Sequence, residues 1–155
     1  IKYLKDLNGH KSTNDLRTAF IKCSALETYM SWLYYKSKND DDAKQLNNGT
    51  IPDEFLRSMF YTFGDFKDLY FDTDISKKDE NMTKVKTKIN NVLQKNGQND
   101  DKKRKEWWDT NGPKIWKGML CGLTYDIKPK GKQTNVLKQL NQKYKYPCDL
   151  EMFAS

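Results

Sequence analysis

The sequence predicts an all-α fold, a helical bundle of about four main helices joined by short helices and long polar loops. Apolar residues recur at steps of three and four in several segments, which is the spacing of one face of an α-helix. No segment alternates between apolar and polar residues as a half-buried strand would. The 155 residues are enough for one core, so we expect a single helical domain or subdomain over residues 1–155.

The first main helix is expected over residues 14–38. Its apolar positions, among them Phe20 and Trp32, fall on more than one face, so we expect this helix to be largely buried. Ser12 or Thr13 can cap its N-terminus, because either hydroxyl can accept a hydrogen bond from a free backbone amide.

Polar residues 37–48 predict a loop with some helical content, and a second helix follows it. Thr50 and Asp53 resemble a capping box, and Pro52 fits the first helical turn. Gly64 is a candidate for a kink or for the end of this helix. The segment is dense in aromatic residues, which predict a substantial core. They are Phe55, Phe60, Tyr61, Phe63, Phe66, Tyr70 and Phe71.

Three more helices are expected in the second half of the chain. Residues 79–94 carry one apolar stripe, and Gly97 is placed to end that helix. A helical line of apolar residues then runs over residues 104–123, straight through Pro113, where we expect a kink. Residues 136–144 predict a last short helix.

The tryptophans are expected to serve mainly as core residues. Trp108 and Trp116 lie at helical spacing on the apolar line, which is typical of buried positions. Trp107 must point elsewhere because it is adjacent to Trp108, so we expect it to be partly exposed.

Nothing in the sequence indicates an enzyme, a metal site or a bound cofactor. The single histidine, His10, lies in a polar stretch, and no glycine-rich phosphate loop is present. The acidic residues between Asp65 and Asp74 lack the central glycine and terminal glutamate of a calcium loop, so we interpret them as caps and turn residues. No apolar run is long enough to span a bilayer, and no N-terminal signal peptide is present.

The net charge of +7 comes almost entirely from lysine and favours diffuse attraction to polyanions such as sulfated glycans, nucleic acid or anionic lipid. Alternatively, these lysines simply solvate the surface. The absence of a nucleic-acid-binding motif counts against nucleic acid. The candidate ligand-binding residues are Lys84, Lys88, Lys102, Lys103, Arg104, Lys114, Lys117, Lys128, Lys130 and Lys132.

Three ordered blocks of sequence resemble a known family. They are FIKCSALETYMSWLYYK at residues 20–36, GTIPDEFLRSMFYTFGDFKDLYFDTDIS at residues 49–76 and KEWWDTNGPKIWKGMLCGLTYDI at residues 105–127. In order and spacing they resemble the Duffy-binding-like domains of the erythrocyte membrane protein 1 family of malaria parasites. The resemblance is strong over residues 17–127 and implies the middle helical subdomain of such a domain.

The resemblance also implies a location and a cysteine pattern. It places the chain in the extracellular part of a parasite protein on the infected erythrocyte, with the membrane anchor elsewhere in a longer protein. Cysteines there should be oxidised. We expect Cys23 and Cys121 to pair and Cys148 to bond to a cysteine outside the chain; the alternative is three buried free thiols.

The function implied by the resemblance is non-covalent adhesion to a host receptor. The shared motifs are mainly scaffold, so they do not identify the receptor. Positive charge favours a sulfated glycosaminoglycan, chondroitin or heparan sulfate, and a protein such as an intercellular adhesion molecule is the alternative. Generic polyanion binding and a purely structural role between flanking subdomains of the same protein are two further hypotheses. Antibodies are further expected partners.

Overall fold

The computed structural model describes residues 2–5, 7, 11–73 and 80–145. In this part of the chain all regular structure is helical, which confirms the predicted all-α fold. The elements are α1 (Lys2–Lys5), α2 (Thr13–Lys38), α3 (Asp40–Ala43), the 3₁₀ helix η1 (Lys44–Asn48), α4 (Asp53–Phe71), α5 (Glu80–Lys95), α6 (Asp101–Leu123) and α7 (Lys130–Lys143).

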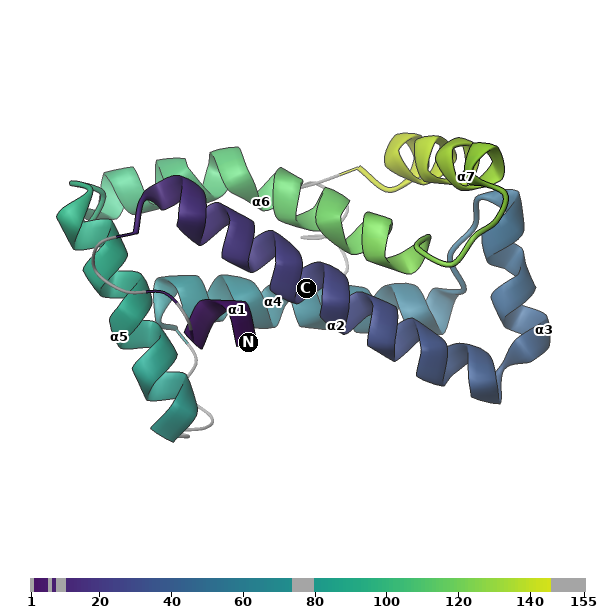
Figure 1. Cartoon of the computed structure of the whole chain (residues 1–155), viewed down its shortest axis with the longest axis horizontal. Coiled ribbons are helices and arrows are strands. Elements are labelled where there is room, and N and C mark those ends of the chain that lie inside the picture. The colour runs from purple at the N-terminus through teal and green to yellow at the C-terminus, as the bar shows by residue number, and fades with distance from the viewer. Residues whose placement is uncertain (1, 6, 8–10, 74–79, 146–155) are drawn as a thin grey trace.

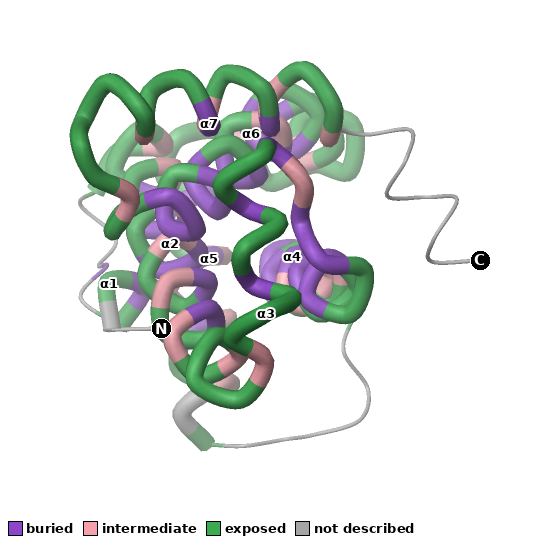
Figure 2. The backbone as a smooth tube through the Cα atoms, turned by 90° about the vertical axis from the view of Figure 1, so that its right-hand side faces the viewer, coloured by how far each residue is buried: buried purple, intermediate pink, exposed green. Residues whose placement is uncertain are grey.

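Three long helices form the body of the molecule. In Figure 1, α2 crosses the front, α6 runs beside it and α4 lies behind them. One end is closed by α5, and the other carries α3, η1 and α7. Figure 2 shows that the buried parts of the chain face the space between these helices. The bundle therefore offers its ends and the outer faces of its helices to a partner.

Helix α2 begins with a capping box. The hydroxyl of Ser12 accepts a hydrogen bond from the Asp15 amide at 3.2 Å, and the Asp15 carboxylate accepts one from the Ser12 amide at 2.9 Å. These bonds favour the ionised carboxylate and hold the pKa of Asp15 below its usual value. Of the two predicted caps, the structure uses Ser12.

Helix α4 departs from the predicted pattern at its N-terminal cap. The expected Thr50–Asp53 capping box is wrong, because Pro52 occupies the N-cap position and no side chain caps the helix. The helix also passes through Gly64 without ending and stops at Asp72, whose backbone is left-handed with φ of 58°.

Helices α5 and α6 largely follow the sequence pattern, whereas α7 begins at Lys130, six residues before the predicted start at residue 136. Helix α5 is followed by Gly97 at φ of 69°, as expected for a C-terminal cap. Helix α6 begins three residues earlier than expected, because Asp100 caps it by accepting a bond from the Lys103 amide at 2.8 Å. It contains Pro113 and continues to residue 123.

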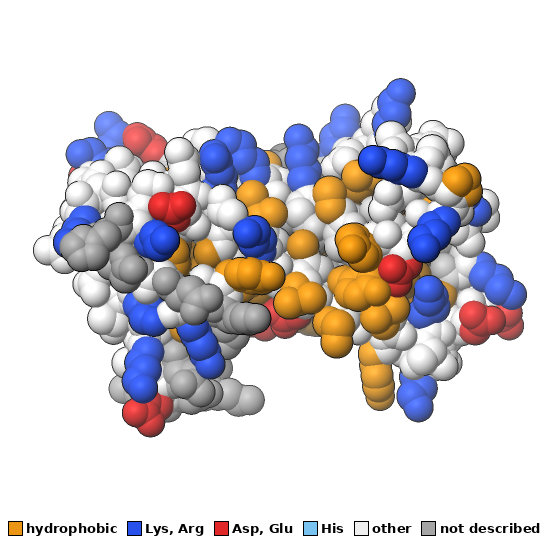
Figure 3. Space-filling view, in the orientation of Figure 1, with side chains coloured by type: hydrophobic (Ala, Val, Ile, Leu, Met, Phe, Trp, Pro, Cys, Tyr) orange, Lys and Arg blue, Asp and Glu red, His pale blue; other side chains and the backbone are white. Residues whose placement is uncertain are grey.

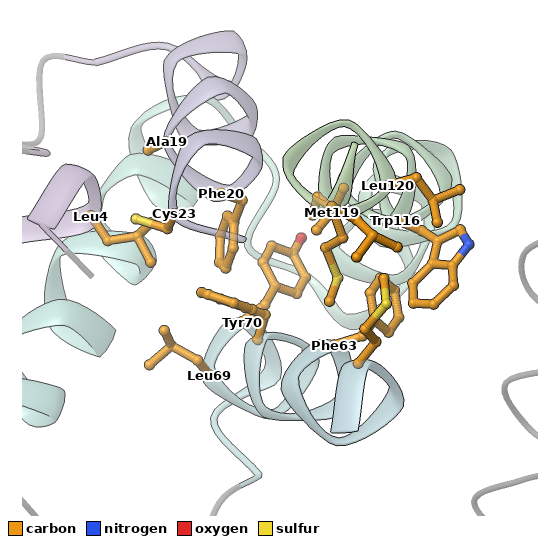
Figure 4. Close-up of a cluster of buried hydrophobic side chains, with 14 of the residues drawn as sticks. Leu4, Ala19, Phe20, Cys23, Phe63, Leu69, Tyr70, Trp116, Met119 and Leu120 are labelled. Carbon is orange, nitrogen blue, oxygen red and sulfur yellow. The ribbon is translucent and has the colours of Figure 1, made fainter. Parts of the chain in front are cut away.

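The core is built largely from aromatic rings of α2, α4 and α6, which converge in Figure 4. Trp108 and Trp116 are buried, as predicted. The expected partial exposure of Trp107 is wrong: only 8% of its surface is exposed, because its ring stacks on Tyr70 at 4.8 Å between centroids. Adjacent tryptophans can both be buried here because α6 has neighbours on more than one side.

Candidate polyanion-binding surface

The positive charge of the protein is concentrated in one quarter of its sequence. Residues 110–148 contain eight lysines and a single acidic residue, Asp126. The other 20 basic and 20 acidic residues of the chain balance, so this segment accounts for the whole net charge of +7. The scarcity of acidic residues over this segment shows where the net positive charge lies, which the local clusters of lysine alone do not show.

These lysines lie on the C-terminal half of α6, on the following turn, on α7 and just after α7, and all eight are exposed. Blue side chains follow this upper edge of the molecule in Figure 3. We call this region the α6–α7 basic surface. It consists of Lys114, Lys117, Lys128, Lys130, Lys132, Lys138, Lys143 and Lys145.

Side-chain hydrogen bonds fix α7 to the rest of the bundle. The indole Nε1 of Trp116 donates to the Tyr144 carbonyl at 2.9 Å, and the Tyr144 hydroxyl accepts from the Ile51 amide at 2.9 Å. Gln133 donates to the carbonyls of Thr124 and Tyr125 at 3.1 and 3.0 Å. Val136 and Leu140, two apolar side chains of α7, are buried. The lysines are thus displayed from a fixed platform.

Among the residues that the structure describes, the α6–α7 basic surface is not neutralised by ion pairs. Within the described residues, none of its eight lysines forms an ion pair. Lys143 donates to the hydroxyl of Thr50 at 3.1 Å, which leaves its charge uncompensated. An array of unpaired, solvated ammonium groups attracts polyanions and repels other cations.

Five of the ten predicted ligand-binding residues belong to this surface, namely Lys114, Lys117, Lys128, Lys130 and Lys132. The others lie on α5 or at the N-terminal end of α6, away from α7 (Figure 1). Lys84 pairs with Glu80 at 3.8 Å, and Lys88 donates to the carbonyl of Lys5. Lys102 is exposed. Lys103 pairs with Asp100 at 3.9 Å.

Arg104, the remaining one of the ten predicted ligand-binding residues, makes contacts within the bundle. Its guanidinium donates to the Asn90 side chain at 2.9 Å and to the Tyr70 carbonyl at 2.7 Å. The Tyr70 hydroxyl in turn donates to the Arg104 carbonyl at 2.9 Å. Burial raises the pKa of this hydroxyl above its usual value. Arg104 therefore ties α6 to α4 and α5.

The predicted Cys23–Cys121 disulfide is not formed in the structure, where both residues are free thiols. Cys23 is buried in the core on α2, whereas Cys121 lies on the exposed side of α6, so the two side chains face different surroundings. Partial burial raises the pKa of the Cys121 thiol. Cys148 lies outside the described residues.

One apolar surface was not predicted. Leu26, Met30 and Tyr34 follow one stripe of α2 and are 47%, 58% and 69% exposed, so this helix is less buried than expected. Tyr125, after α6, is 67% exposed and packs edge-on against Tyr29 at 5.3 Å. Apolar side chains gather on this face in Figure 3. The sequence signal for this surface is the low amphipathicity of α2. A helix with apolar residues on all its faces carries more of them than its neighbours can cover, so some remain exposed.

Membrane-spanning and metal-binding features are both absent from the described residues. No helix there combines the length and the apolar character needed to cross a bilayer. In the same part of the chain, no three histidine, cysteine or acidic side chains gather where they could hold a metal ion.

Comparison with known proteins identifies the family. No curated protein and no solved structure matches the chain. The family model described as the Duffy binding domain matches residues 1–152, nearly the whole sequence. Domains of this family are extracellular modules that bind host receptors. Because this match covers nearly the whole chain, the chain belongs to the Duffy-binding-like domain family and is a receptor-binding adhesion module.

Proposed function

We propose that this module binds a sulfated glycosaminoglycan, chondroitin or heparan sulfate, through the α6–α7 basic surface. The observation that supports the proposal is the gathering of eight exposed lysines over a sequence segment that contains one acidic residue. Among the described residues, none of these lysines forms an ion pair. Each exposed contact contributes little, but several contacts to one polyanion add to a useful, salt-sensitive affinity.

For the biological setting we propose what the sequence resemblance implies. The chain acts as the middle helical subdomain of a parasite adhesin on the infected erythrocyte and holds that cell to host tissue. Recognition is non-covalent, and no chemical reaction takes place.

A sulfated glycan fits this surface better than nucleic acid does. All eight basic residues of this surface are lysines. Lysine makes compact point-charge contacts, whereas specific phosphate recognition more often uses the planar fork of arginine.

A charge-matched pair of variants tests the proposal. We expect Lys114→Gln/Lys117→Gln/Lys138→Gln to weaken binding to heparin and to chondroitin sulfate by about tenfold at low salt, because three contacts are lost. The matched control Lys84→Gln/Lys102→Gln/Lys103→Gln removes the same charge elsewhere and should change affinity by about twofold or less. Isothermal titration or surface plasmon resonance measures both.

The outcomes separate local binding from general charge attraction. An equal loss of glycan affinity in the two triple variants would show that binding depends only on the net charge of the protein. Absence of glycan binding by the unmodified chain would end the proposal.

A protein receptor is the second candidate, favoured by the exposed apolar stripe of α2. Exposed apolar patches commonly mark protein interfaces. Binding of a protein receptor that survives the triple lysine change and is lost on Met30→Asp/Tyr34→Asp would favour this candidate.

A further inference from the structure

A cavity of about 310 Å³ opens at the edge of the α6–α7 basic surface. It lies between the C-terminal part of α2, the α3–η1 segment and the turn after α6. Its volume falls in the range of small-ligand pockets. The residues that matter for its chemistry are Trp32, Lys36, Asp40, Lys44, Asp126 and Lys128.

The cavity combines free cations with carboxylates that can accept hydrogen bonds. Within the described residues, Lys36 and Lys128 form no ion pair, whereas Lys44 lies 4.0 Å from Asp40 and 3.4 Å from Asp41. The carboxylate of Asp126 is held by the hydroxyl of Tyr29, which donates to it at 2.9 Å. A ligand is thus offered ammonium donors and carboxylate acceptors together.

The apolar part of the cavity wall is rigid. Trp32 stacks on Tyr35 at 5.6 Å between centroids and meets the edge of Phe55 at 4.9 Å. Leu46 and Leu123 also line the cavity and are buried. Because these side chains are packed into the core, this wall does not need to rearrange when a ligand arrives.

We propose that this cavity binds one acidic sugar residue of a sulfated glycan and so provides a selective subsite beside the diffuse basic surface. The sulfate or carboxylate of the sugar contacts Lys36 and Lys128, its hydroxyls donate to Asp40 and Asp126, and its apolar face lies over the Trp32 side of the cavity. This inference rests on the proposed glycosaminoglycan function and adds a reason for selectivity.

The two carboxylates distinguish a sugar from other polyanions. Sugar hydroxyls are donors and can satisfy carboxylate oxygens, which only accept. The sugar–phosphate backbone of a DNA strand carries phosphates and no hydroxyl donors between its ends, so Asp40 and Asp126 repel a strand that binds the lysines through its phosphates. Such a repulsive element is a common basis of binding specificity.

Removing the carboxylates should therefore affect the two ligands in opposite directions. We expect Asp40→Ala/Asp126→Ala to weaken binding of a chondroitin sulfate octasaccharide by about tenfold, since charge-assisted hydrogen bonds are lost. The same variant should bind a single-stranded oligodeoxynucleotide of equal charge slightly more tightly. The control Asp101→Ala/Glu106→Ala removes two exposed charges at the far end of α6 and should slightly raise affinity for both ligands.

The outcomes distinguish this inference from the proposed function. Tighter glycan binding by the cavity variant would overturn the cavity site while leaving binding to the α6–α7 basic surface intact. Weaker binding of both ligands would also count against it, because hydroxyl recognition affects the glycan alone. Absence of glycan binding by the unmodified chain would overturn both. A second variant, Lys36→Gln/Lys128→Gln, should bind the glycan about tenfold more weakly than the unmodified chain. The control Lys84→Gln/Lys102→Gln should weaken glycan binding only about twofold. An equal loss of affinity in these two variants would contradict the cavity site.

Discussion

Substitution of Gly122 by alanine is expected to lower the free energy of unfolding by about 3 kcal/mol, because it overfills the contact between α2 and α6. A Cβ at this position would lie 2.2 Å from the carbonyl oxygen of Ala25 and 2.9 Å from its carbonyl carbon. Both are backbone atoms and cannot rotate away, so the two helices would have to separate. Since α2 and α6 form the most extensive helix pair of the bundle, the damage should spread through the core.

Gly64 provides the matched control for this prediction. It also lies inside a helix, but among the described residues a Cβ built there meets no neighbouring atom within 4 Å. Gly64→Ala should therefore leave stability unchanged or raise it by about 0.5–1 kcal/mol, as expected from helix propensity. Urea denaturation measures both variants. Equal stability of Gly122→Ala and Gly64→Ala would contradict the close approach of α2 and α6.

Truncation of Phe20 to alanine should lower the free energy of unfolding by about 4 kcal/mol, because it leaves a cavity at the centre of the core. Phe20 is fully buried and has four aromatic neighbours with ring centroids 6.1–6.2 Å away. These neighbours come from α4 and α6 and are held by one another, so they cannot collapse fully into the space. They are Phe66, Tyr70, Trp107 and Trp108.

An exposed aromatic residue shows whether the effect depends on burial. Tyr61 of α4 is 68% exposed, and Tyr61→Ala should change stability by about 0.5 kcal/mol or less. Thermal melting followed by circular dichroism would compare Phe20→Ala with Tyr61→Ala. Similar melting temperatures for these two variants would place Phe20 outside the core.

Sequence periodicity predicted the main helices α2, α4, α5 and α6 well because each carries a long apolar stripe that is buried in the structure. The Thr50–Asp53 motif failed because a capping box is a local pattern that tertiary contacts can override. In the structure Thr50 lies two residues before the N-cap, and its hydroxyl accepts a bond from Lys143 of α7. That partner is 93 residues away in sequence, so no local pattern could reveal it.

The candidate surface was predictable in part for the same reason. Lysine clusters are visible in the sequence, but their availability depends on partners that the fold supplies. Lys88 reaches the carbonyl of Lys5, and Arg104 reaches that of Tyr70, across 83 and 34 residues. Helix α7 contains no acidic residue. Among the described residues, no lysine of α7 forms an ion pair. The absence of acids over residues 110–125 and 127–148 was therefore a better guide than the local density of lysine.

The most direct test of the central claim is a nuclear magnetic resonance titration of the ¹⁵N-labelled chain with a chondroitin sulfate octasaccharide. If the α6–α7 basic surface binds the glycan, the amide chemical shifts should change along residues 114–143 and around Lys36. These changes should become smaller as salt is added. Shift changes confined to α5, to the N-terminal half of α6 or to the apolar stripe of α2 would contradict it.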